Sequence, residues 1–73
     1  MAKKGGSAVY RVTEVIGTSS QSWEDAARNA VKTAASTLRD LRIAEIVKLD
    51  MKVESGKVVA YRARIQLSFK YDA

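Results

Sequence analysis

The chain has 73 residues, no Cys and no His, and a formal charge of +5 from 13 Lys and Arg against 8 Asp and Glu. This length suffices for one small domain, and the missing Cys and His exclude disulfides and the zinc, haem and iron–sulfur sites that depend on them. Hydrophobic residues make up 47% and charged residues 29%, as is typical of a globular protein. Because so short a chain has a marginal core, we expect it to associate with other copies.

Residues 1–7 read MAKKGGS, a basic, Gly-rich segment without the apolar stretch of a signal peptide. We expect a flexible tail there, followed by a single domain over residues 8–73. No apolar run approaches the roughly 20 residues of a membrane span. The sequence therefore predicts a protein without a membrane partner, and we expect it in the cytoplasm.

Enzymatic chemistry is not expected. The chain lacks His, Cys and a serine in a GxSxG context, which are common nucleophiles and general bases. Nucleic-acid binding has little support either, because Lys3 and Lys4 lie in the tail and leave 11 positive against 8 negative residues, a surplus of three.

The first predicted strand covers residues 8–16, which are β-branched and aromatic. Residues 17–20 interrupt it, and Ser22 with Asp25 forms an S-x-x-D capping box that predicts a helix start. An apolar stripe at helical spacing follows, made of Trp23, Ala27, Ala30, Val31, Ala34, Leu38 and Leu41. Small residues dominate this stripe, so the helix can lie close to a sheet.

Two further strands are predicted over residues 42–54 and 58–71, where apolar and polar residues alternate. A two-residue turn would place the apolar face of one strand against the polar face of the other. We therefore expect a three-residue loop over 55–57, which pairs Glu54 with Val58. That register continues as Val53 with Val59, Met51 with Tyr61, Asp50 with Arg62 and Leu49 with Ala63.

The predicted fold class is α+β, with the element order β-α-β-β. Placing the third strand in the centre gives the order 1-3-2, makes all neighbours antiparallel and lets one helix cover the sheet. The opposite sheet face would still carry Val9, Val15, Ala44, Ile46, Val58 and Ala60. This face and the edge strands are our candidates for subunit contact.

Three segments together resemble the dodecin family: VYRVTEVIGTSSQSWEDAA, TLRDLRIAEIV and YRARIQLSFKYD. The similarity runs from Ala8 onward and keeps the order and spacing of the elements. The resemblance implies a subunit whose sheet wraps one helix, and a hollow shell of twelve identical copies. It also implies non-enzymatic binding of flavin, and in some members of coenzyme A.

Flavin-binding members of that family carry a Trp after the helix that stacks on the flavin, and the matching residue here is Ile43. They also carry a Gln in the last strand that hydrogen-bonds the flavin, where this chain has Arg62, which can only donate. A basic residue found near phosphate groups corresponds to Asp50. The resemblance thus points to Ile43 and Arg62 as cofactor-site positions and implies weak or absent flavin binding.

These departures are similar to a branch of the family that lacks the Trp, for which calcium has been suggested as the ligand. Calcium takes six to eight oxygen ligands, and the chain has no EF-hand loop. Several copies of one carboxylate at a symmetry axis could supply the oxygens, so Asp50 and Glu54 are the metal-site candidates. The alternative for Asp50 is an exposed cross-strand ion pair with Arg62.

Two classes of function stay open. The first is a non-enzymatic, dodecin-like homo-oligomeric shell that binds, stores or buffers a small molecule or ion. The second is a small basic β-α-β-β module that binds nucleic acid. Flavin absorbance on purification would support the first class, and salt-sensitive retention on DNA would support the second.

Overall fold

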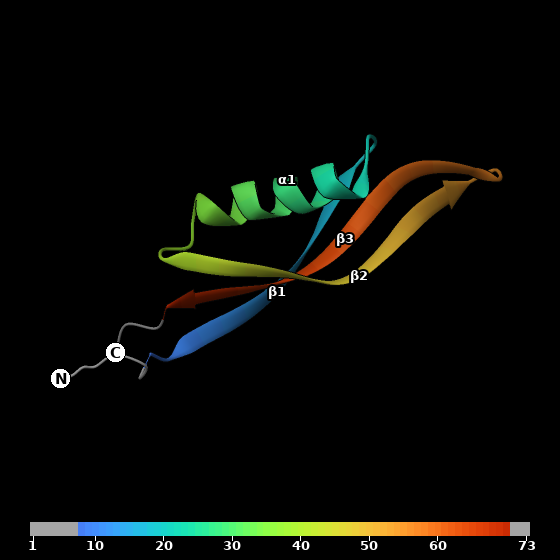
Figure 1. The fold of residues 1–73 in the computed structure, drawn as a ribbon. Coiled ribbons are helices and arrows are strands. Elements are labelled where there is room, and N and C mark those ends of the chain that lie inside the picture. The colour runs from blue at the N-terminus through green and yellow to red at the C-terminus, as the bar shows by residue number, and fades with distance from the viewer. Residues whose placement is uncertain (1–7, 71–73) are drawn as a thin grey trace.

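The computed structural model describes residues 8–70, so the expected tail over residues 1–7 lies outside them. Its elements are β1 (Tyr10–Ser19), α1 (Trp23–Ala35), β2 (Leu41–Glu54) and β3 (Lys57–Lys70) (Figure 1). The predicted order β-α-β-β is confirmed. β1 begins two residues later than predicted, at Tyr10, and ends three residues later, because Gly17, Thr18 and Ser19 continue the strand.

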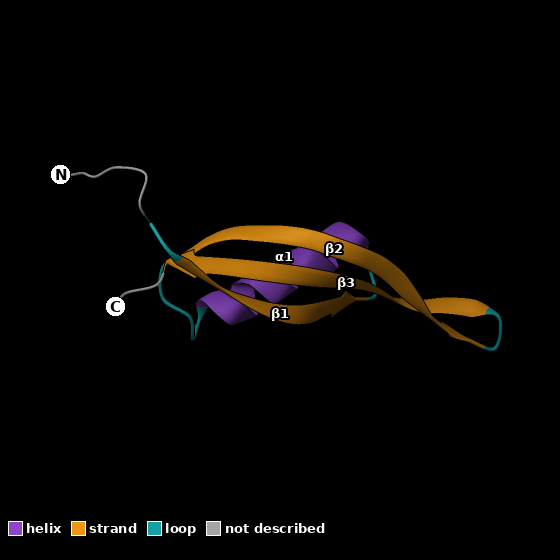
Figure 2. Cartoon of the chain, turned by 90° about the horizontal axis from the view of Figure 1, so that it is seen from below, coloured by secondary structure: helices purple, strands orange, loops and turns teal. Residues whose placement is uncertain are grey.

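The sheet has the order β1-β3-β2 with antiparallel neighbours throughout, which confirms the predicted topology. Helix α1 lies across one face of this sheet, and the other face is open in the view from below (Figure 2). We call the open face, on the side away from α1, the outer face. It is the face to which the candidate site belongs.

Helix α1 begins as the sequence predicts. Ser22 is the N-cap, and its hydroxyl accepts a hydrogen bond from the backbone N–H of Asp25 at 3.0 Å. The Asp25 carboxylate accepts from the Ser19 hydroxyl at 2.7 Å, which ties the end of β1 to the first turn of α1. The helix ends at Ala35, earlier than the apolar stripe, and Leu41 already belongs to β2.

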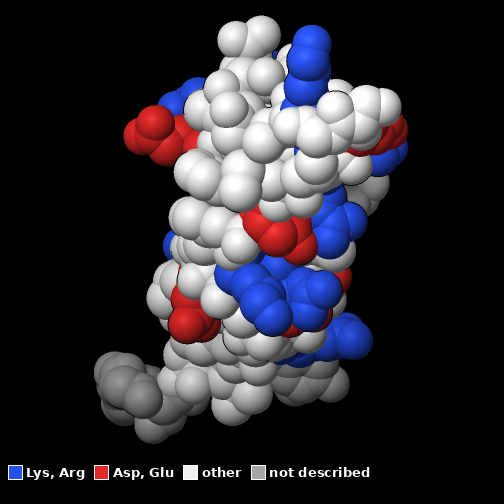
Figure 3. All heavy atoms as spheres, turned by 90° about the vertical axis from the view of Figure 1, so that its right-hand side faces the viewer, with Lys and Arg blue, Asp and Glu red and all other residues white. Residues whose placement is uncertain are grey.

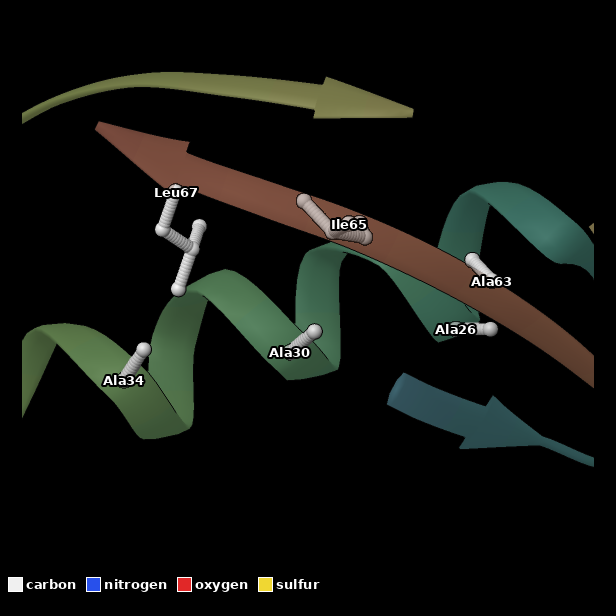
Figure 4. Close-up of a cluster of buried hydrophobic side chains, with 6 residues drawn as sticks. All are labelled: Ala26, Ala30, Ala34, Ala63, Ile65 and Leu67. Atoms are coloured by element: carbon white, nitrogen blue, oxygen red, sulfur yellow. The ribbon is translucent and has the colours of Figure 1, made fainter. Parts of the chain in front are cut away.

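The buried core lies between α1 and β3. Three alanines of the helix face three residues of the central strand, as Figure 4 shows: Ala26, Ala30 and Ala34 against Ala63, Ile65 and Leu67. Ala26 is fully buried although the predicted stripe did not include it. Ile65 and Leu67 are the only large side chains that are completely buried among the described residues, so the core is small.

The turn between β2 and β3 differs from the prediction. It has two residues, Ser55 and Gly56, with φ of 50° and 76°, and Glu54 pairs with Lys57 and not with Val58. Positive φ at both central positions is typical of the type I′ hairpin turn, whose twist matches that of the strands.

A β-bulge reconciles this turn with the rest of the hairpin. The register shifts between Lys52 and Val53, so that Val59 is an extra residue in β3. Val53 therefore pairs with Val58 and not with Val59 as predicted. Beyond the bulge the predicted register is confirmed for Met51–Tyr61, Asp50–Arg62 and Leu49–Ala63.

A second bulge, at Val47, decides which residues of β2 share the helix side of the sheet. Because the register shifts there, Ile46 pairs with the buried Ile65. The sequence predicted that Val15, Ala44 and Ile46 lie on the sheet face opposite the helix. This prediction is wrong, because each of the three pairs with a β3 residue that is buried against α1.

The described chain leaves much apolar surface open. Large hydrophobic side chains with 41–63% of their surface exposed are Val9, Tyr10, Val12, Ile16, Ile43, Ile46, Val47, Leu49, Met51, Val53, Val58 and Val59. The radius of gyration is 15.4 Å, against about 11 Å for a compact domain of this length. The β2–β3 hairpin reaches beyond the helix (Figure 1), where no other described element covers it.

Candidate functional site

The four predicted site positions lie on the outer face or at its hairpin end. Asp50 pairs with Arg62, and Ile43 pairs with Ser68, six residues further along β3. Arg62 and Ser68 alternate with the buried residues of β3 and therefore point away from α1. Glu54 follows Asp50 at an even spacing near the turn, on the same side of β2.

Asp50 and Arg62 form a bidentate ion pair. The Nε–H and Nη2–H groups of Arg62 donate to the two carboxylate oxygens of Asp50 at 2.7 and 2.8 Å. These hydrogen bonds lower the pKa of Asp50, desolvation opposes the shift, and the positive charges of Arg62, Arg64 and Lys48 support it. The same contact raises the pKa of Arg62. The cross-strand ion pair expected for Asp50 is present.

Trp23 holds the backbone of Asp50 from the other side. Its indole N–H donates to the carbonyl oxygen of Asp50 at 2.9 Å, and its ring meets Tyr61 edge-on with centroids 5.1 Å apart. β2 is an edge strand, so its outward carbonyls are open to such donors. The first turn of α1 therefore fixes the segment of β2 that carries the ion pair.

Ile43 and Arg62 do not meet within one chain. Their positions are separated by six residues along β3, about 20 Å at the rise of a strand. Ile43 is 58% exposed beside Ser68. A pocket that uses Ile43 and Arg62 together must take them from different copies of the chain.

Asp50 and Glu54 are also apart, by four residues or about 13 Å along β2. The Glu54 carboxylate pairs with Lys52 at 3.3 Å, and both side chains are more than half exposed. Over residues 8–70 there is no group of three or more acidic, His or Cys side chains that could hold a metal ion. A calcium site with these ligands therefore requires several copies.

A groove that sequence reasoning missed lies between β1 and α1. Its volume is about 540 Å³, and it contains none of the predicted site residues. The residues that line it include Val15, Gly17, Thr33, Ala34 and Leu38. The sequence showed the small residues that let the helix lie close to the sheet. It contained no pattern that predicts a groove between β1 and α1.

The surface at the hairpin end carries charged side chains of both signs. Viewed from the hairpin end, acidic and basic atoms are interspersed (Figure 3). Such a surface lacks the contiguous basic stripe expected of a nucleic-acid-binding module. None of the helices within residues 8–70 is long and apolar enough to span a bilayer.

Comparison with known proteins places these features in a family. The sequence model of the dodecin family matches residues 9–72. The calcium dodecin of Mycobacterium tuberculosis is 44% identical over 62 residues, covering 85% of this chain and 87% of the relative.

Solved structures agree. Dodecin from Streptomyces coelicolor matches with a TM-score of 0.87 and 36% identity, over 94% of this chain and 99% of the other. The M. tuberculosis calcium dodecin, described with a novel calcium-binding site, matches with a TM-score of 0.78 and 45% identity, over 88% and 91%.

Proposed function

Because the chain belongs to the dodecin family, we propose that it forms a shell of twelve identical copies that binds a small ligand or ion and has no enzymatic activity. The exposed apolar surface carries this proposal. Over residues 8–70 the subunit has two fully buried large side chains and an uncovered hairpin, so association with other copies buries apolar surface that one chain leaves exposed.

Native mass spectrometry tests the assembly. Twelve copies of 8.0 kDa give about 96 kDa, and any bound ligand adds its own mass. A compact monomer at micromolar concentration, seen by light scattering, would contradict the shell.

For the ligand we propose calcium, with Asp50 and Glu54 as the carboxylate donors. The similarity to a protein named calcium dodecin supports this choice, and the separation of the two residues requires donors from several copies. Arg62 competes with calcium for Asp50, because it holds both carboxylate oxygens. Calcium that binds Asp50 therefore meets the positive charge of Arg62, which already occupies one lone pair on each carboxylate oxygen.

This competition gives a sharp experiment. Isothermal titration with calcium should show weaker binding for Asp50→Asn and Glu54→Gln, and tighter binding for Arg62→Gln, which frees the Asp50 carboxylate. Glu24→Gln on the exposed side of α1 is the matched control and should bind like the parent chain. No calcium heat for the parent, or calcium binding that none of the site variants alters, would contradict these donors.

For flavin we propose weak or absent binding. Ile43 cannot stack as an aromatic ring does, and Arg62 is already engaged by Asp50. Riboflavin should keep its fluorescence when this protein is added. Ile43→Trp should increase quenching, because it restores a stacking surface at the exposed position. Quenching of riboflavin at nanomolar concentrations of the unmodified protein would contradict the assignment.

A further inference from the structure

The first turn of α1 lies at the end of the helix nearest the β2–β3 hairpin (Figure 1). Trp23 is the first residue of the helix, and its indole N–H donates to the carbonyl oxygen of Asp50 at 2.9 Å. This hydrogen bond joins two residues that are 27 positions apart in the chain. The carboxylate of the same Asp50 is held on the outer face by Arg62. Two different elements therefore hold Asp50, one through its backbone and one through its side chain.

The bond from Trp23 satisfies a carbonyl that the sheet leaves open. Because β2 is an edge strand, a carbonyl that points away from β3 has no partner in the ladder of the sheet. In an antiparallel pair, residues whose backbone groups point outward face each other without ladder bonds, and their side chains lie closest together. Asp50 and Arg62 are cross-strand partners of this kind. The ladder therefore does not restrain the Asp50 carbonyl, whereas Trp23 does.

The ion pair depends on the direction of the Asp50 side chain. Its two carboxylate oxygens lie 2.7 and 2.8 Å from two nitrogen atoms of Arg62, so a rotation that favours one contact lengthens the other. The carbonyl carbon of Asp50 is bonded to the Cα that carries this side chain. A hydrogen bond to the carbonyl oxygen fixes the plane of the peptide group, and with it the direction of the Cα–Cβ bond.

Trp23 is itself held by its surroundings. Its ring meets the ring of Tyr61 edge-on with centroids 5.1 Å apart, and Tyr61 precedes Arg62 on β3. Ser19 of β1 pairs with Tyr61, and its hydroxyl donates to the Asp25 carboxylate in the first turn of α1 at 2.7 Å. β1 and β3 therefore fix the turn that carries the indole N–H.

We propose that Trp23 is a positioning residue for the Asp50 site: its indole N–H aims the Asp50 carboxylate, and release of that carboxylate from Arg62 loosens Trp23 in turn. The coupling is reciprocal, because each contact stabilises the conformation of Asp50 that the other requires. The consequence for calcium rests on the proposed function, whereas the consequence for Trp23 does not. In this way α1 takes part in a site on the sheet face that it does not cover.

Fluorescence quenching by acrylamide tests the coupling without any ligand. Trp23 is the only Trp of the chain, so the emission reports on this residue alone. Asp50→Asn and Arg62→Gln should each increase the quenching constant, because the loosened Asp50 peptide exposes the indole to solvent. Glu54→Gln is the matched control, since it also neutralises a carboxylate of β2, but one that pairs with Lys52. It should be quenched like the parent chain.

Calcium titration tests the positioning role in the Arg62→Gln chain, where Arg62 no longer competes for Asp50. Adding Trp23→Phe keeps an aromatic ring but removes the N–H. It should weaken calcium binding about five-fold, the net value of one hydrogen bond. Adding Lys32→Gly instead is the control, because it weakens α1 at an exposed position of the last turn and should leave the calcium affinity unchanged.

The outcomes separate this inference from the proposed function. Equal quenching constants for the parent, Asp50→Asn and Arg62→Gln overturn it, and so does an equal increase for Glu54→Gln, which would indicate a general loosening of the hairpin. A calcium affinity that Trp23→Phe leaves unchanged also overturns it. If neither the parent nor Arg62→Gln gives calcium heat, the calcium proposal fails, and the quenching comparison decides whether Trp23 positions Asp50.

Discussion

β1 and α1 approach each other closely at Gly17, and Gly17→Ala tests this contact. A Cβ at this position would lie 2.1 Å from the carbonyl oxygen of Ala26 and 2.8 Å from the Cβ of Ala30. Ordinary contact begins at 3.4 Å, so the gap to the Ala26 oxygen must open by 1.3 Å, the difference between 3.4 and 2.1. That oxygen belongs to the helix backbone, and it cannot swing aside as a side chain does.

The loss of stability depends on the packing contacts that the helix would lose if it moved away from the sheet. A displacement of this order separates the helix from the small core, and a gap of 0.5–1 Å already forfeits about a quarter to a half of the dispersion energy at each contact. Overpacking of this kind costs about 1–3 kcal/mol. The loss of glycine flexibility in the unfolded chain offsets about 0.4–1 kcal/mol. Because the clash is with the helix backbone, the upper ends of both ranges apply, about 3 less about 1, and we expect a net loss of about 2 kcal/mol in the free energy of unfolding.

Urea titration followed by circular dichroism measures this loss, at one protein concentration for all variants. Gly56→Ala is the matched control: it makes the same chemical change where no atom lies within 4 Å, but at a φ of +76°. Its cost should be the strain of a left-handed residue alone, about 1 kcal/mol. If Gly17→Ala costs no more than Gly56→Ala, the close approach of α1 to β1 is not as described.

Three smaller predictions concern the first helical turn and the ion pair. Ser22→Ala removes the N-cap and should lower the free energy of unfolding by about 1 kcal/mol in the same titration; an unchanged midpoint would show that the cap is dispensable. Trp23→Phe removes the N–H that donates to the Asp50 carbonyl and should also cost about 1 kcal/mol, whereas no loss would mean that water replaces it. Asp50→Asn tests pH dependence. Because Arg62 lowers the pKa of the folded carboxyl below its usual 3.8, its stabilisation is complete above that value and is lost as the pH falls through the folded pKa. The parent's Tm should therefore fall more steeply than the variant's below about pH 4, and parallel curves would contradict this.

The central strand was the most predictable part of the fold. β3 is buried on one face along Ala63, Ile65 and Leu67, so its alternation is regular and its face can be read from the sequence. The Asp50–Arg62 pair was predictable for the same reason, because it lies between two bulges where the register is undisturbed.

The turn and the faces of the edge strands were not predictable from alternation. A uniform register excludes the two-residue turn at Ser55 and Gly56, and only the bulge at Val59 makes it compatible with the pairing further along. In β1, Val15 and Ile16 are adjacent and both apolar, so alternation cannot say which one faces α1. Ile16, which lies on the outer face, is apolar like a core residue, and the alternation within one chain does not tell a core residue from one that another copy covers.

The register shift at Val47 changes what sequence distance means along β2. Ile43 and Asp50 are seven residues apart, an odd number that would put them on opposite faces of a regular strand. With one extra residue between them, Ile43 pairs with Ser68 and Asp50 with Arg62, so both share the outer face. Deleting Val47 would shorten the strand by one residue yet leave every remaining cross-strand pair intact. In an alignment with a relative that lacks the bulge, a one-residue gap at Val47 therefore keeps the same residues on the outer face. An alignment without that gap would assign the residues on one side of Val47 to the wrong face of the sheet.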